Sequence, residues 1–583
     1  MKKKYTNERN VQIVISLLKA YGIKRVIASP GTTNMTFVGS IQQDSWFEIY
    51  SSVDERSAAY LACGMAAETG EPVVISCTGA TASRNYMPGL TEAYYRKLPV
   101  LAITSHRGDA SIGHLLDQQI DRRQIPNDIA MQSVTVPLVT QATDENYCVI
   151  EASKAILALF HRGGGPAHIN LHTSYSRSFD VTELPATRVI RRFEDLSSAP
   201  IINDNLKVAV FVGSHAKMNV ELQSALESFC ETYNAIIISD HTSGYYGKYK
   251  IPFALLGGQV LHTSTFKDID LLIHIGEVSG DAYGRGFSPR RVWRVSLDGE
   301  LRDMYHTLTD VFEVEEVNFF RHYAKVDVKN TTRYEQYKKE YSLAYNNIEN
   351  LPFGNIWIAK EIHHKLPQNS ELHLGILNSL RSWDFFSVDS SIETYSNVGG
   401  FGIDGGVSSM LGASLVNQNK LYFGVFGDLA FFYDMNVLGN RHIGNNVRLL
   451  LINNGRGNEF RLSMHPCSIF GQDADKYMAA AGHYGNQSSL LVKHYAENLG
   501  YKYISASTKE EFNNVVDVFL NPVINQSIVF EVFTQMEDET SALDMTLRSL
   551  KDSSQIVKDK IKSAIKNSPL KPVAEKVISI IRK

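Results

Sequence analysis

Short apolar runs alternate with longer segments of helix-forming residues along most of the chain. These runs have the length and composition of strands that are buried on both faces. The clearest of them are residues 24–28, 207–213, 270–275, 421–426 and 447–452. Strands that alternate with helices along a chain predict parallel sheets with helices packed on both faces.

The alternation forms three blocks, so we expect an α/β fold with three doubly wound parallel-sheet domains and a helical C-terminal tail. The expected bounds are residues 1–185, 186–345, 346–535 and 536–583. We interpret the polar stretch 183–205 as a linker and the tyrosine-rich stretch 334–349 as a connection. The second block lacks a Gly-x-Gly-x-x-Gly loop after its first strand, which favours plain sheet structure over a nucleotide site. For the tail, a solvated packing helix is favoured over a partner-binding or membrane-surface helix.

Composition narrows the class of protein. The 583 residues include 58 basic and 62 acidic ones, with a net charge of −4 and no basic patch of the kind that binds nucleic acid. The five cysteines have no metal-ligand spacing, which indicates reduced thiols. No apolar run approaches the roughly 20 residues needed to cross a bilayer. We therefore expect a cytoplasmic protein with small-molecule substrates, no nucleic-acid partner and no membrane span.

Polar residues follow two of the apolar runs in the third block. Gly427 and Asp428 come directly after one predicted strand, and Asn454 follows the next, 26 positions beyond Asp428. The carboxyl ends of parallel strands meet at one edge of a sheet, where α/β folds bind ligands. Carboxylate and amide oxygens suit a hard divalent cation. Turn punctuation is the alternative for either pair alone, and it is the favoured interpretation for Asn445 and Asn446, which precede the strand.

A glutamate in the first block lies at a comparable junction. Glu55 follows the predicted strand 46–50 and opens a helix of small residues, 57–67. The short strand 24–28 ends nearby in a turn that contains Pro30 and Gly31. A helix N-terminal acid that complements the helix dipole is the alternative reading of Glu55.

Together these motifs resemble the cofactor site of thiamine diphosphate-dependent enzymes. The resemblance implies that Asp428, Asn454 and the main-chain carbonyl of Arg456 hold Mg²⁺ at the diphosphate. It also implies that Glu55 contacts the aminopyrimidine ring and so activates the cofactor. The order of pyrimidine, central and diphosphate blocks resembles the decarboxylase and acetolactate synthase branch of these enzymes. The implied cofactors are thiamine diphosphate and Mg²⁺.

Within that branch the chain is most similar to the 2-succinyl-5-enolpyruvyl-6-hydroxy-3-cyclohexene-1-carboxylate synthases of menaquinone biosynthesis. The matching motifs extend over most of the chain and imply roles for individual residues. Cofactor contacts are implied for Pro30, Gly31, Thr78, Gly402, Ile403, Asp404, Gly427, Leu429 and Ala430, with Ile403 propping the bent cofactor. Catalytic roles are expected for Glu55, Gln118, His106 and Arg107. Substrate contacts are expected for Thr33, Asn34, Ser379, Arg381, Glu459 and Phe460.

The chain departs from these synthases where they carry arginines for their acidic substrates. Thr33 and Val398 stand at two such positions and Trp383 at a third, although Arg381 is close in sequence to the last. Arginine forks are the natural clamp for carboxylates. Glu459 is an acid where the family is usually apolar. These differences predict a less acidic substrate pair.

We expect an enzyme that decarboxylates a 2-oxo acid and transfers the acyl unit to a carbonyl or enoyl acceptor. The alternatives are a simple decarboxylase that releases an aldehyde, the menaquinone-pathway synthase itself, and a non-catalytic cofactor-binding paralogue. His106 and His114 are the candidates for proton transfer because histidine titrates near neutral pH. A structural role is favoured for each of them, least strongly for His106. The resemblance implies a homodimer or a dimer of dimers with active sites at subunit interfaces.

Overall fold

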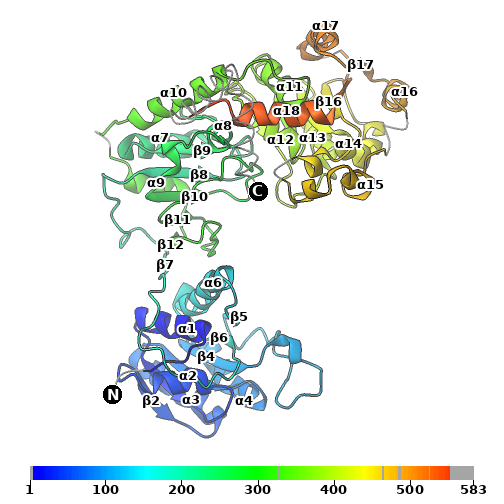
Figure 1. Ribbon diagram of the computed structural model, residues 1–583. Coiled ribbons are helices and arrows are strands. Elements are labelled where there is room, and N and C mark those ends of the chain that lie inside the picture. The colour runs from blue at the N-terminus through cyan, green and yellow to red at the C-terminus, as the bar shows by residue number, and fades with distance from the viewer. Residues whose placement is uncertain (1–3, 326–327, 463–464, 483–487, 524, 552–583) are drawn as a thin grey trace, which may run out of the picture. The chain divides into compact units, whose positions relative to one another are not determined.

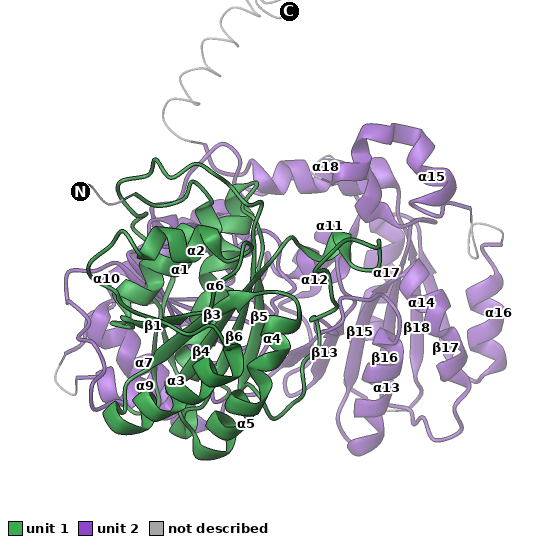
Figure 2. Cartoon of the chain, turned by 90° about the horizontal axis from the view of Figure 1, so that it is seen from below, with its two compact units in different colours: residues 1–195, 298–313 green, residues 196–297, 314–583 purple. Residues whose placement is uncertain are grey.

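The computed structural model describes residues 4–325, 328–462, 465–482, 488–523 and 525–551 (Figure 1). The chain divides into two compact units, one of residues 1–195 with 298–313 and the other of residues 196–297 with 314–583 (Figure 2). The pairs of neighbouring strands in the sheets are parallel, which confirms the predicted α/β class. The finer division at 185, 345 and 535 stays a prediction. Among the described residues, no helix is both long and apolar enough to cross a membrane.

The first unit contains a six-stranded sheet with strand order β2-β1-β3-β4-β6-β5. The strands are β1 (Arg25–Ala28), β2 (Glu48–Ser51), β3 (Val73–Thr78), β4 (Val100–His106), β5 (Gln132–Val136) and β6 (Ala167–His172). The helices are α1 (Arg9–Ala20), α2 (Met35–Ile41), α3 (Glu55–Thr69), α4 (Thr81–Asn85), α5 (Met87–Arg96) and α6 (Ala142–Ala158). The predicted strands at 24–28 and 46–50 and the predicted helix at 57–67 are therefore present.

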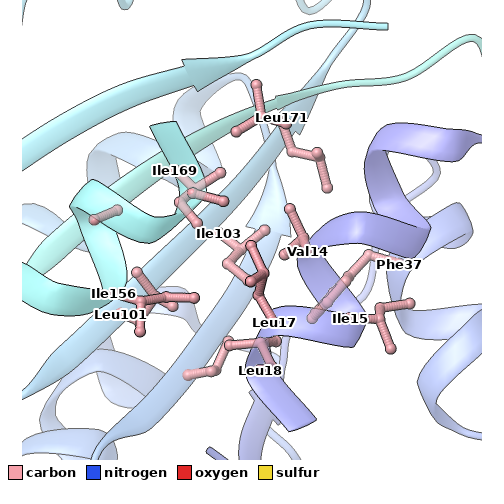
Figure 3. Packing of buried hydrophobic residues seen from close by; sticks show 14 of the residues in the cluster. Val14, Ile15, Leu17, Leu18, Phe37, Leu101, Ile103, Ile156, Ile169 and Leu171 are labelled. Carbon is pink, nitrogen blue, oxygen red and sulfur yellow. The ribbon is translucent and has the colours of Figure 1, made fainter. Parts of the chain in front are cut away.

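Both faces of this sheet are covered. Leu17 of α1 and Ile156 of α6 belong to one buried apolar cluster with Leu101 and Ile169 of the sheet (Figure 3). On the other face, α3 and α5 approach closely, because a Cβ atom on Gly89 would lie only 2.4 Å from the Cβ of Ala59. Ala59 and Ala62 of α3 share a buried cluster with Ile75 of β3, so the helix that begins at Glu55 packs on this face of the sheet.

The stretch that we interpreted as a linker contains a short strand. Residues Arg191–Phe193 form β7, which pairs in parallel with β12 (Leu308–Phe312) inside the first unit. An ion pair of 2.6 Å between Arg191 and Asp310 and a stacked contact between Phe193 and Phe312 hold the two strands together. Strand β7 depends on this distant partner, so its own three residues gave no strand signal.

The second unit contains two sheets. The strands of the one nearer the N-terminus are β8 (Val208–Val212), β9 (Ile236–Ser239), β10 (Leu271–Ile275) and β11 (Val292–Val295), in the order β11-β10-β8-β9. Its helices are α7 (Val220–Tyr233), α8 (Ala254–Gly257), α9 (Glu316–Tyr323) and α10 (Thr332–Asn346). The tyrosine-rich connection predicted at 334–349 is thus largely the helix α10.

The other sheet of this unit has the order β14-β13-β15-β16-β18-β17. Its strands are β13 (Glu371–Leu374), β14 (Glu393–Tyr395), β15 (Tyr422–Gly427), β16 (Val447–Asn453), β17 (Lys502–Ala506) and β18 (Ile528–Phe533). Its helices are α11 (Asn355–Ile362), α12 (Asn378–Trp383), α13 (Gly406–Val416), α14 (Asp428–Asp434), α15 (Ala474–Tyr477), α16 (Leu491–Asn498), α17 (Lys509–Leu520) and α18 (Met536–Leu547). The helical tail predicted from residue 536 begins with α18, and residues 552–583 lie outside the described part.

Glycines set the packing of α13 on β15. A Cβ atom on Gly424 of β15 would lie 2.3 Å from the sulfur of Met410, and one on Gly406 would lie 2.8 Å from the ring of Phe426. Helix α13 therefore lies directly on the strand, with its first residue next to the carboxyl end of β15. This close packing places the loop before α13 at the edge of the sheet where Asp428 begins α14.

Candidate functional site

Asp428 is the central acid of the site in the second unit. It begins α14 at the end of β15 and is only 4% exposed. Its carboxylate accepts hydrogen bonds from the backbone N–H groups of Leu429 at 2.7 Å and Gly455 at 2.5 Å. Burial raises the pKa of Asp428 to about 6, although the backbone donors oppose the shift. A buried carboxylate that is costly to ionise alone is well suited to a cation.

The two asparagines that follow β16 have different environments. Asn453 is buried and donates its amide to Glu531 at 2.7 Å, so it is part of the core. The side-chain oxygen of Asn454 is also buried, but it has no hydrogen-bond partner among the described residues. Because buried polar atoms are rarely left unpaired, this oxygen is a fitting ligand for a metal ion.

The backbone around these residues leaves room for a ligand. A Cβ atom on Gly427 would meet nothing within 4 Å, so this face of the strand end is open. Gly455 has a φ of 75°, a conformation that favours glycine and that presents its N–H to Asp428. Arg456 directs its guanidinium to Asp475 at 2.7 Å, and its predicted metal contact involves only its main-chain carbonyl. The donor set of Asp428 and Asn454 therefore fits Mg²⁺ and a diphosphate.

The loop before α13 carries three predicted cofactor residues. Gly402 and Asp404 are exposed, and Ile403 is half-buried. A Cβ atom on Gly402 would lie 2.3 Å from the carboxylate of Asp404, which would have to turn away to make room for it. Leu429 and Ala430 lie in the first turn of α14, both half-buried. The structure thus brings the predicted diphosphate-side residues to one edge of one sheet.

The predicted substrate residues of this unit form an ion pair. Arg381 of α12 pairs with Glu459, and both side chains are 15% exposed. Ser379 is buried on the same helix, and Phe460 packs edge-on against His465 with ring centroids 5.1 Å apart. The charge of Glu459 is therefore balanced by Arg381, so this residue is not an unpaired acid facing the substrate.

Val398 and Trp383, for which the sequence interpretation expected replacement of substrate arginines, are core residues. Trp383 is fully buried and Val398 is 3% exposed. A Cβ atom on Gly280 would lie 2.8 Å from Val398, so this part of the core is tightly packed. No charged side chain would fit either position without a cost in desolvation.

In the first unit, Glu55 is the first residue of α3 and is half-buried. Asp54 caps the helix by accepting the N–H of Arg56 at 2.9 Å. Glu55 is the acid in the first turn of the helix, so the alternative role, in which it complements the helix dipole, stays open. The carboxylate of Glu55 accepts a hydrogen bond from Asn85 at 3.2 Å. Glu55 is thus held in place with one oxygen available.

The turn after β1 lies against the end of β3. A Cβ atom on Gly31 would lie 1.9 Å from Thr78, so this position requires glycine, and Pro30 beside it is exposed. Asn34 is buried and donates to the carbonyl of Ser29 at 2.9 Å, which ties the turn to the sheet. Thr33 is 2% exposed, and its hydroxyl has no hydrogen-bond partner among the described residues.

The predicted catalytic residues around β4 differ in their exposure. His106 ends the strand and is 4% exposed, and burial lowers its pKa to about 3. It is therefore neutral at pH 7, which speaks against a proton-donor role and for the structural alternative. Arg107 binds Tyr175 and Asp117, while Gln118 is exposed with a left-handed φ of 57°. The structure does not gather these three side chains into one contact.

A buried polar network behind His106 was missed by the sequence interpretation. Arg122, 5% exposed, donates to Thr104 and to Asn170, and Asn170 contacts the Nε2 atom of His106 at 2.7 Å. Thr104 also contacts His168 at 2.7 Å. The sequence did contain a pattern that could have revealed this network. In the buried strand β6, His168, Asn170 and His172 alternate with apolar residues.

Comparisons with known proteins give the same family. Residues 9–125 match the model described as thiamine pyrophosphate enzyme, N-terminal TPP binding domain. The 2-succinyl-5-enolpyruvyl-6-hydroxy-3-cyclohexene-1-carboxylate synthase of Phocaeicola vulgatus is 29% identical over 572 residues, covering 94% of this chain and 100% of the relative. The synthase of that name from Bacteroides thetaiotaomicron is 29% identical over 563 residues, with the same coverage. That of Flavobacterium johnsoniae is 27% identical, covering 90% of this chain and 95% of the relative. The similarity to thiamine diphosphate-dependent enzymes is therefore confirmed.

Proposed function

We propose that this thiamine pyrophosphate-dependent enzyme decarboxylates a 2-oxo acid and transfers the remaining acyl unit to a carbonyl or enoyl acceptor. The observation that carries the proposal is the pairing of a buried acid, Asp428, with the unpartnered oxygen of Asn454 at one sheet edge. These residues and the carbonyl of Arg456 would hold Mg²⁺ and the diphosphate. Glu55 would hold the aminopyrimidine ring. When bound, the cofactor supplies a nucleophilic carbon and an electron sink for the loss of CO₂.

The named relatives support ligation over simple decarboxylation. These relatives are synthases by name, and they match this chain over nearly its whole length. They support the reaction of that synthase better than they support a carboligase that acts on other substrates. That reaction is therefore the first candidate for the substrate pair.

A less acidic substrate pair is the second candidate, and one observation favours it. Arg381, the arginine closest to the replaced positions, is paired with Glu459. Thr33, Val398 and Trp383 are buried and carry no charge to offer a carboxylate. The grip on a dicarboxylic donor would therefore be weak, because carboxylates are held best by free arginine forks.

Assembly as a dimer, with Glu55 of one subunit at the cofactor of another, is part of the proposal. Exposed apolar side chains lie close to Glu55 along the chain, among them Val53 at 79%, Leu61 at 50% and Tyr60 at 47%. Several exposed large apolar residues in one short segment are typical of an interaction surface. A cytoplasmic location remains a prediction from the unpaired cysteines.

The test is a screen of 2-oxo acids for CO₂ release by the purified protein, with and without candidate acceptors. We expect release that depends on thiamine diphosphate and Mg²⁺ and that rises with the right acceptor, and the Asp428→Ala variant should be inactive in parallel. Release that no acceptor accelerates, with an aldehyde as the product, would replace ligation with simple decarboxylation. Cofactor binding without any CO₂ release would favour the non-catalytic paralogue.

A further inference from the structure

Two segments that leave neighbouring parts of one sheet meet in a buried ion pair. Helix α12, which follows β13, supplies Arg381, and the short helical segment Asn458–Arg461, which follows β16, supplies Glu459. Strand β15, which ends at Asp428, lies between these two strands. The pair is therefore at the same sheet edge as the candidate metal ligands.

Glu459 is bound by more than the arginine. The amide of Asn378, in the orientation that satisfies both of its polar groups, donates to the second carboxylate oxygen of Glu459 at 2.8 Å. The same amide accepts the backbone N–H of Glu459 at 3.2 Å. Both carboxylate oxygens thus have a donor from α12, and the geometry resembles the clamping of a bound carboxylate.

Arg381 and Asn378 also line a small cavity of about 20 Å³, which is room for one water or one hydroxyl group. Of the described residues that line it, Arg381 is the only basic one and Glu539 is the only acid. The Nε atom of Arg381 and the side-chain oxygen of Asn458 are buried there without a partner among the described residues. An unpaired donor and an unpaired acceptor on two residues that line one cavity suit a hydroxyl group, which both donates and accepts.

We propose that Glu459 is an internal carboxylate that occupies Arg381, so that this end of the substrate site takes an uncharged, hydroxyl-bearing group and excludes a carboxylate. The role in substrate choice rests on the proposed function, whereas the occupation of Arg381 by Glu459 does not depend on it. A substrate carboxylate would have to displace Glu459 from a site that is already neutral. A hydroxyl group needs only the two unpaired atoms.

The first experiment tests the occupation alone. Glu459→Ala removes a volume close to that of acetate and leaves Arg381 without its partner. We expect acetate to bind this variant at least 10-fold more tightly than it binds the wild type, in calorimetry at constant ionic strength, and to raise its thermal midpoint. Acetamide should do neither, and the double variant Arg381→Met with Glu459→Ala should lose the effect. Equal acetate binding by all three proteins would overturn the proposal.

The second experiment uses Glu459→Gln, which removes the charge and keeps the shape of the side chain. It also serves as the test if Glu459→Ala does not fold. We expect the ratio of kcat/KM for 2-oxoglutarate to that for 2-oxopentanoate, which lacks the second carboxylate, to rise at least 10-fold. The matched control is Glu371→Gln, which removes another buried acid, partnered by Lys420, at the amino end of β13. An unchanged ratio in Glu459→Gln would overturn the specificity role. If no 2-oxo acid is consumed while acetate still discriminates, the proposed function fails and the internal pair stands.

Discussion

The carboxylate of Asp428 accepts a hydrogen bond of 2.5 Å from the backbone N–H of Gly455, which joins the ends of two neighbouring strands. The contact explains why a glycine with a φ of 75° directly follows Asn454. A side chain at Gly455 would strain this conformation and disturb both candidate metal ligands. The contact also explains how two dipeptides far apart in the sequence form one site.

Burial of Asp428 predicts a pH-dependent stability of the metal-free protein. Its pKa is raised from 3.8 to about 6, so the folded chain binds the proton more tightly than the unfolded chain does. Its contribution to the free energy of unfolding is therefore largest below pH 4 and falls by up to about 3 kcal/mol as the pH rises to about 6. The side chain of Asp428→Asn cannot ionise, so the free energy of unfolding of this variant should lack this part of the pH dependence.

The measurement is the thermal midpoint of both proteins in EDTA between pH 4 and pH 7. We expect the midpoint of Asp428→Asn relative to the wild type to rise with pH. With Mg²⁺ and thiamine diphosphate, the wild type should gain stability and the variant should not. A cofactor-induced gain of equal size in the variant would remove Asp428 from the metal site.

The two neighbouring asparagines should respond differently to the same substitution. Asn453→Ala leaves a buried oxygen of Glu531 without its donor and should cost about 1–3 kcal/mol of stability. Asn454→Ala removes an oxygen with no partner in the described chain and should leave the stability of the metal-free protein nearly unchanged. Its affinity for Mg²⁺ with thiamine diphosphate should fall sharply, measured by calorimetry. Equal effects of the two variants on both quantities would contradict the assignment.

Glu55→Gln should retain cofactor binding and lose most cofactor activation. The amide keeps the shape of the side chain and its contact with Asn85, but it lacks the charge. Hydrogen–deuterium exchange at C2 of the bound cofactor should slow strongly. If subunits share sites, mixing Glu55→Gln with Asp428→Ala should restore activity in hybrid dimers. Failure to restore it, with subunit exchange verified, would count against the shared site.

Substrate competition decides between the two candidate substrate pairs. If Thr33, Val398 and Trp383 replace substrate arginines, as the resemblance implies, each substrate carboxylate loses roughly 1.5–3 kcal/mol of binding free energy, which is about one to two decades in binding. Under the second candidate, pyruvate or a similar small 2-oxo acid should be a better donor than 2-oxoglutarate, and a polyhydroxylated carbonyl compound should be a better acceptor than isochorismate. Direct competition with products identified by mass spectrometry checks this. Fastest turnover with 2-oxoglutarate and isochorismate would assign the reaction of the named synthases.

The sequence by itself determined the elements around the site. The buried strands β15 and β16 and the short strand β1 were each readable from local composition, because a strand buried on both faces needs a continuous apolar run. The positions of Gly427, Asp428 and Asn454 followed, because parallel strands present their carboxyl ends at one edge. The weak strand β7 was missed, since its stability comes from a partner more than a hundred residues away.

Only the tertiary structure decided which polar groups are free and which are already satisfied. Asn453 and Asn454 are identical in type and adjacent, yet one is bound to Glu531 and the other has an unpaired oxygen. Arg381 and Glu459 had appeared to be independent substrate residues, and they neutralise each other. His106 was a candidate for proton transfer, and its burial, together with the nearby charge of Arg122, lowers its pKa. Hydrogen-bond partners and local desolvation arise from residues distant in sequence, so the ionisation and availability of a side chain are properties of the folded chain.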